Sequence, residues 1–183
     1  MTEFAHSSPA SRTTLYIMAL AICSVLFTLG FACAVPLAAF AAISAMSFDR
    51  RTAVLATGAV WLANQAVGFA FLHYPIDGET LAWGGALGAI ALLSCEAAGL
   101  MTRRVAGVAG ACAAFVAGFI AYEGSLLLID AGLGLIEHVD FLGKVRIFLI
   151  NACAFGGLWA LKTIVSSTTF GRKLTASLSE RRA

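Results

Sequence analysis

The fold is decided by residues 14–48, which read TLYIMALAICSVLFTLGFACAVPLAAFAAISAMSF and contain no charged side chain. As a single helix rising about 1.5 Å per residue, this stretch would extend beyond about 50 Å, whereas the hydrocarbon core of a bilayer is about 30 Å thick. The helix breakers Gly30 and Pro36 predict a turn near residues 29–34, between two helices of about 16 residues each. The stretch therefore predicts a hairpin of two short transmembrane helices.

A secretory signal is the alternative interpretation of the same stretch. Arg12 precedes an apolar segment, and Ala32, Cys33 and Ala34 fit a small-x-small cleavage site. The apolar run continues unbroken past this site, which favours the hairpin. Both interpretations stay open at the level of the sequence.

Composition indicates a membrane protein over the remaining length as well. Of the 183 residues, 60% are hydrophobic and 12% are charged, and the mean hydropathy is +0.90. Soluble domains carry about twice that share of charged residues. The net charge of +2 is too small to indicate a nucleic-acid partner. The five cysteines lie in apolar runs without C-x-x-C spacing, so we expect neither a disulfide framework nor a metal site.

Four further apolar segments follow the first hairpin, separated by short charged links. They predict helices over residues 52–72, 80–101, 105–129 and 144–165. Thr80 is the expected N-cap of the helix that begins there. Gly110, Ala114 and Gly118 recur at four-residue spacing, a pattern typical of close helix packing in membranes.

The basic residues predict how these six helices are oriented, because cytoplasmic loops carry an excess of lysine and arginine. With the N-terminus inside, the inner set contains Arg12, Arg50, Arg51, Arg103, Arg104, Lys162, Arg172, Lys173, Arg181 and Arg182. The outer set contains Lys144, Arg146, Asp77, Glu79, Asp130, Glu137, His138 and Asp140.

This asymmetry predicts an all-α, multi-pass protein of the cytoplasmic (inner) membrane. Its fold is expected to be a six-transmembrane-helix bundle over residues 14–166 in an N-in, C-in orientation. Residues 1–13 are expected to form a cytoplasmic tail, and residues 167–183 a basic cytoplasmic tail.

The candidate site centres on residues 61–83, which read WLANQAVGFAFLHYPIDGETLAW. Asn64 and Gln65 interrupt an apolar run, and an amide buried in hydrocarbon without a partner costs about 2–7 kcal/mol. Polar groups in other helices are expected at a similar depth, which predicts one cavity open to the outside. The expected substrate-binding residues are Trp61, Asn64, Gln65, His73, Tyr74, Trp83, Glu123, Arg146 and Asn151, with Phe69 and Tyr122 as further aromatic lining.

Each of these residues also has a purely structural interpretation. Membrane proteins place Trp and Tyr in interfacial belts, and buried amides bridge neighbouring helices without a ligand. Arg146 is expected to meet either Glu137 and Asp140 in an ion pair or an anionic group of a ligand. Lys144 aligns with Asn151 at seven-residue spacing and can serve either purpose.

Catalytic and metal chemistry are not indicated by any motif. His73 and His138 fall in outer loops, but no H-x-x-x-H or Cys-His spacing accompanies them. Glu96 is expected to reach the membrane interface or to pair with Arg103. The sequence has no G-x-S-x-G, H-E-x-x-H or P-loop motif, so we expect no enzyme activity and no cofactor. Energised transport would then require a partner.

Six short helices in 183 residues, with both ends cytoplasmic and a polar, aromatic outer cavity, resemble the substrate-binding S-components of energy-coupling-factor (ECF) transporters. The row Ala34, Ala38, Ala41, Ala42 and Ala45 is similar to the family's Ala-x-x-x-Ala docking motif, although it falls in the second expected helix instead of the first. The resemblance implies a vitamin- or metal-binding protein that docks onto a transmembrane coupling subunit driven by two ATPases.

Two branches of this family do not fit the residues of this chain. No cysteine falls in the outer loops, so the cobalt ligand of cobalamin-binding members is not carried over, and the Met-His N-terminus of nickel and cobalt members is not found. The leading hypothesis is therefore a binding subunit for uptake of a small aromatic or anionic micronutrient, with residues 73–79 as a lid. The alternatives are a membrane scaffold or accessory subunit, and an intramembrane enzyme.

Overall fold

The computed structural model describes residues 9–31, 35–133 and 141–167, apart from the side chains of residues 9, 10, 12, 28–31 and 165–167. Six helices and no strands occur within these residues, which confirms the all-α prediction. The helices are α1 (Pro9–Phe31), α2 (Leu37–Ser47), α3 (Arg50–Ala70), α4 (Gly78–Arg104), α5 (Gly107–Gly132) and α6 (Phe141–Ser167).

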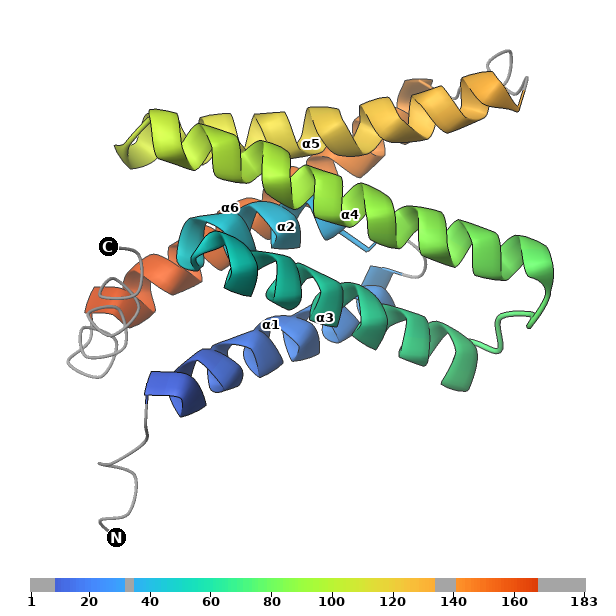
Figure 1. Cartoon of the computed structure of the whole chain (residues 1–183), viewed down its shortest axis with the longest axis horizontal. Helices are drawn as coiled ribbons and strands as arrows, with labels where there is room; N and C mark the ends of the chain where they lie inside the picture. Colours follow the sequence, from blue (N-terminus) through green and yellow to red (C-terminus); the bar gives the residue numbers. More distant parts are fainter. Residues whose placement is uncertain (1–8, 32–34, 134–140, 168–183) are drawn as a thin grey trace, which may run out of the picture.

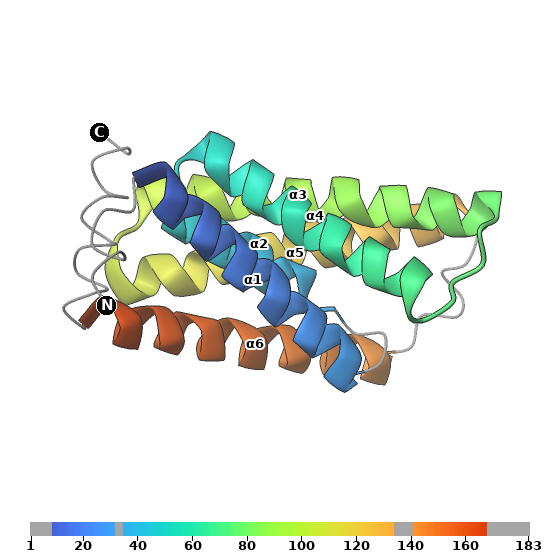
Figure 2. The ribbon, with the colours of Figure 1, turned by 90° about the horizontal axis from the view of Figure 1, so that it is seen from below.

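Successive helices run back and forth along one bundle axis (Figure 1). α1 begins and α6 ends at the same end of the bundle, where α2 meets α3 and α4 meets α5 (Figures 1 and 2). Arg50, Arg51, Arg103 and Arg104 lie at these two connections. We refer to this as the arginine end of the bundle.

Four helices, α3 to α6, are long and apolar enough to cross a membrane. The chain is therefore a multi-pass membrane protein. Within the part of α1 whose side chains the structure describes, a shorter apolar segment covers Thr13–Phe27. α1 packs chiefly against α3. α1 begins at Pro9, so residues 9–13 of the expected tail are helical.

The expectation of two helices of similar length in residues 14–48 is wrong for α2. This helix has 11 residues, which at about 1.5 Å per residue span roughly half of a bilayer core. All of its residues except Met46 are buried. It lies at the centre of the bundle and contacts α3, α4, α5 and α6 (Figure 1). α2 is thus a half-length core helix around which the longer helices pack.

Side chains of α6 form hydrogen bonds with backbone groups at both ends of α2. Asn151 Oδ1 accepts a hydrogen bond from Ala39 N at 3.2 Å, and Lys162 Nζ donates to Met46 O at 3.1 Å. The Asn151 amide oxygen thus pairs with an N–H group of the first turn, which has no partner within the helix. The Lys162 cation likewise pairs with a carbonyl of the last turn. Asn151 and Lys162 are about three helical turns apart and therefore share one face of α6.

Aspartates form the N-caps of two membrane-crossing helices. Asp49 accepts from Thr52 N at 3.2 Å at the start of α3, and Asp77 accepts from Thr80 N at 2.7 Å at the start of α4. Hydrogen bonding to Thr52, chiefly to its side chain, lowers the pKa of the Asp49 carboxyl group, and hydrogen bonding to Thr80 lowers the pKa of Asp77. The prediction of Thr80 as the cap is wrong, because α4 begins earlier, at Gly78, and Thr80 is the donor.

The small-residue packing face predicted in α5 is confirmed. Gly110, Ala114 and Gly118 are all buried. Gly118 lies against Ser94 of α4, whose hydroxyl donates to Gly118 O at 2.6 Å, and a Cβ at Gly118 would come within 3.3 Å of Ser94 O. The α4–α5 pair has the most extensive interface in the bundle, which these small residues allow.

Candidate functional site

Asn64 is fully engaged in joining α1 to α3. Its Nδ2 donates to Ser24 Oγ at 2.9 Å and to Val60 O at 2.8 Å, and the residue is 7% exposed. Ser24 is buried and donates in turn to Ala21 O. The amide that the sequence singled out therefore acts as a bridge between two helices.

Trp61 and Gln65 both face α4. Trp61 Nε1 donates to Gly84 O at 2.9 Å, and its ring covers Gly88, where a Cβ would come within 2.7 Å of it. Gln65 Oε1 lies above Gly84, where a Cβ would come within 2.9 Å. The Gln65 amide makes no hydrogen bond to a described residue, so of the adjacent amides only Gln65 has free donors and acceptors.

The loop after α3 is shaped by His73 and Tyr74. His73 adopts the left-handed backbone conformation with φ of 55°, which turns the chain back after α3 ends. Tyr74 N then donates to Gly68 O at 3.1 Å, and the Tyr74 ring meets Phe69 edge to face. His73 itself is exposed, and Trp83 on α4 is partly buried.

Glu123 of α5 and Lys144 of α6 form an ion pair inside the bundle. Lys144 Nζ lies 3.0 Å from Glu123 Oε2, and the side chains are 27% and 11% exposed respectively. Neither oxygen of Glu123 is accessible to solvent, and neither accepts a hydrogen bond from a described residue. The carboxylate is thus buried against the Lys144 ammonium group. Tyr122, beside Glu123 in α5, is also buried.

An aromatic row lies next to this pair along the interface of α5 and α6. Phe119 and Phe148, one turn from Glu123 and Lys144, meet edge to face with centroids 5.1 Å apart. Phe115 stacks on Phe155 at 4.8 Å, and Phe155 stacks on Trp159. We refer to these five residues as the aromatic row. These residues were not among those expected from the sequence, although Phe115 and Phe119 share one helix face, as do Phe148, Phe155 and Trp159.

The two remaining predicted site residues, Asn151 and Arg146, lie on α6. Asn151 is committed to α2, as described above, and also donates to Ile147 O at 3.0 Å. Arg146 is exposed and forms no ion pair with a described residue. Its expected partners Glu137 and Asp140 lie outside the described residues, as does His138.

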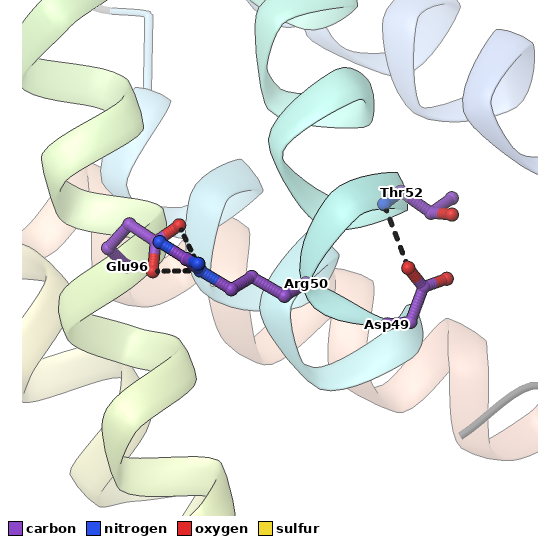
Figure 3. A network of polar contacts seen from close by, with 4 residues as sticks. All are labelled: Asp49, Arg50, Thr52 and Glu96. Carbon is purple, nitrogen blue, oxygen red and sulfur yellow. Dashed lines mark hydrogen bonds and ion pairs between the residues drawn. The ribbon is translucent and has the colours of Figure 1, made fainter. Parts of the chain in front are cut away.

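At the arginine end, Glu96 pairs with Arg50 and not with Arg103, the partner named in one of its two expected roles. Glu96 of α4 instead accepts from Arg50 of α3, whose Nε lies 2.9 Å from each carboxylate oxygen (Figure 3). Arg50 reaches across from the first turn of α3 to make this contact (Figure 3). This second ion pair is open to solvent, with side-chain exposures of 73% and 32%.

The alanine row expected to dock a partner is buried inside the chain's own core. Ala38, Ala41 and Ala42 are fully buried and Ala45 is 6% exposed, while Ala34 lies outside the described residues. These four side chains let α3 to α6 close around α2, so they offer no surface to a coupling subunit.

Among the described residues, Ser44 Oγ, Thr57 Oγ1 and both Glu123 oxygens are buried without a hydrogen-bond partner, and the partly buried Gln65 amide also makes no hydrogen bond. Glu123 is the charged group of this set. No cluster of three His, Cys, Asp or Glu side chains suited to a metal occurs among the described residues. Comparison with protein-family models, curated proteins and solved structures finds no match to this chain.

Proposed function

We propose that this chain is a membrane-embedded binding subunit for the uptake of a small solute, and that Glu123 is the centre of its site. The observation that carries the proposal is the burial of both Glu123 oxygens without a hydrogen bond, with Lys144 as the counter-ion. Ionisable groups inside membrane helices are costly and characteristically serve substrates or ions. A bound solute would supply the hydrogen bonds that the carboxylate lacks.

The surroundings of Glu123 favour a solute with a positive charge or a strong hydrogen-bond donor. A carboxylate accepts hydrogen bonds only, and an aromatic face such as those of Phe119 and Phe148 suits a flat or cationic group. This departs from the anionic group expected on the basis of Arg146, which is exposed. A vitamin-like organic cation or amine is the solute class that the geometry favours.

Topology and energy coupling belong to the same proposal. The alternating direction of the six helices, with α1 starting and α6 ending at the arginine end, supports an N-in, C-in chain with that end in the cytoplasm (Figure 1). A transmembrane coupling subunit with ATPases would energise uptake, as in the ECF transporters that the sequence resembles. The burial of Ala38, Ala41, Ala42 and Ala45 favours a docking surface elsewhere on the chain.

Ligand-dependent stability tests the proposal directly. The protein, purified in a mild detergent, would be examined by native mass spectrometry for a co-purifying molecule and then titrated with water-soluble vitamins and small organic amines. A true ligand at a hundred times its Kd stabilises by about 2.7 kcal/mol. We expect Glu123→Gln to abolish the ligand-induced rise in Tm, and Gln65→Ala to reduce it if the solute extends to α3.

Glu96→Gln is the matched control, because it makes the same chemical change in the other ion pair of the bundle. The rise in Tm is compared with each variant's own Tm without ligand, so a change in basal stability does not enter. An unaltered rise in Glu123→Gln, or a loss of equal size in Glu96→Gln, would remove Glu123 from the site.

A membrane scaffold or accessory subunit is the second candidate, and the polar bridges favour it. Asn64, Trp61 and Asn151 all join helices and leave few groups for a ligand. On this alternative no compound in the panel raises the Tm, while Asn64→Leu lowers it because the bridge to Ser24 is lost.

A further inference from the structure

A cavity of about 260 Å³ lies at the arginine end, among α2, α3 and α4. Its floor is apolar and includes Ala45, Phe48 and Ala53, while its rim carries Arg50, Glu96 and Arg103. The cavity is separate from Glu123, which lies on α5 and does not line it. An apolar floor beneath a charged rim suits a molecule that combines a charged group with hydrocarbon.

The charged groups of the rim are not equally available to bind a ligand. Asp49 is occupied as the N-cap of α3, and Glu96 is occupied by Arg50. Arg103 forms no ion pair with a described residue. Its Nη1 lies over Gly99, 3.5 Å from where a Cβ would stand, so the guanidinium is folded toward the cavity. Arg103 is therefore an arginine of this rim without an ion-pair partner among the described residues.

The local charge favours an anion. The lining carries two arginines, Arg50 and Arg103, and two carboxylates, Asp49 and Glu96. Arg51 and Arg104 follow the two lining arginines in the sequence, so the region as a whole has four arginines and two carboxylates. A guanidinium binds a phosphate through paired, charge-assisted hydrogen bonds. Basic pockets between helices at the cytoplasmic surface are suited to acidic lipid headgroups. The apolar floor favours a lipid over free phosphate, because free phosphate has no hydrocarbon to place there.

We propose that this cavity binds the phosphate headgroup of an anionic phospholipid, with Arg103 as the principal donor and Arg50 at the opposite side. The lipid would join the end of α4 to the start of α3 and would anchor the arginine end at the membrane surface. The proposal is independent of the solute site at Glu123.

Lipid binding to the full chain tests this proposal. The detergent-solubilised protein at about 0.15 M salt, where distant surface charges are screened, would be titrated with phosphatidylglycerol or phosphatidylcholine of the same acyl chains. Native mass spectrometry would count bound lipids and give an apparent Kd for each. We expect one phosphatidylglycerol to bind, and Arg103→Gln to weaken it at least about tenfold.

Arg104→Gln is the matched control, because it removes the same charge one residue further on and does not line the cavity. We expect it to weaken binding less than about threefold, since it contributes only general attraction. Arg103→Lys keeps the charge but loses the planar fork, so an intermediate Kd is expected; this variant serves if Arg103→Gln is poorly folded.

Three results would overturn the proposal. Equal losses in Arg103→Gln and Arg104→Gln would show that general surface charge attracts the lipid. Equal binding of phosphatidylcholine would show that the headgroup charge is not recognised. Stabilisation by inorganic phosphate, without stoichiometric binding of phosphatidylglycerol, would identify a soluble anion as the ligand.

Discussion

The two ion pairs of this protein have nearly the same length but opposite surroundings. Arg50 Nε and Glu96 are 2.9 Å apart, and Lys144 Nζ and Glu123 are 3.0 Å apart. The Arg50 side chain is 73% exposed, whereas the Glu123 side chain is 11% exposed. Glu96 accepts well-formed hydrogen bonds, and Glu123 accepts none from a described residue.

This difference in burial determines how each ion pair affects the stability of the fold. An exposed pair contributes about 0–1 kcal/mol because water competes for both charges. A buried pair carries a desolvation cost that its attraction does not reliably offset, so its presence is weak evidence for stability. A buried pair inside membrane helices is better explained by a function.

The largest effect is expected from Lys144→Met, which leaves the Glu123 charge buried without a counter-ion. Breaking a buried pair from one side costs about 3–5 kcal/mol. Glu123→Gln is expected to cost less, because the Lys144 side chain is 27% exposed and can extend to water. Reversible unfolding in mixed detergent and sodium dodecyl sulfate would measure both free energies.

The double variant Glu123→Leu with Lys144→Met sharpens this test. Since both charges are removed together, most of the stability lost in Lys144→Met should return. If the double variant is as unstable as Lys144→Met, the pair stabilises the fold through its shape and contacts, and the contrast with the exposed pair fails.

An intermediate effect is expected at Asn151, which is buried like Glu123 but uncharged. Asn151→Leu removes the acceptor of Ala39 N and leaves the start of α2 unsatisfied, at a cost of about 1–3 kcal/mol. Thr163→Val on the exposed side of α6 is the control, with an expected change within about 0.5 kcal/mol. Equal effects on unfolding would show that the cap of α2 does not contribute to stability.

Helix count and order were predictable from the sequence, but the role of α2 was not. Apolar runs marked all six helices, with Gly30 and Pro36 between the first two and charged links from α2 onward, and the ends of α3 to α6 differ from expectation by a few residues. A helix that crosses lipid and a half-length helix surrounded by other helices are both apolar. Hydropathy therefore does not separate them, and alanines that line a core resemble alanines that dock a partner.

Individual residues of the candidate site were predictable from the sequence, but the contacts between them were not. Glu123 was identified because a charge interrupts an apolar run, and this does not depend on the fold. Its pairing with Lys144, the bridge from Asn64 to Ser24 and the aromatic row all depend on how separate helices cross. Neither composition nor periodicity contains that information.

The smallest effect is expected at the exposed pair, which a double-mutant cycle of Arg50→Gln and Glu96→Gln would measure. The coupling free energy should be about 0.2–1 kcal/mol and should fall as salt rises, because both groups already contact water. The same cycle at Lys144 and Glu123 should give a larger coupling that salt changes little, since buried charges are poorly screened. A coupling at Arg50 and Glu96 as large and as insensitive to salt as the buried one would mean that the lipid cavity beside them shields this pair from water. The ion pairs at the two ends of the bundle would then differ in the ligand beside them and not in their burial.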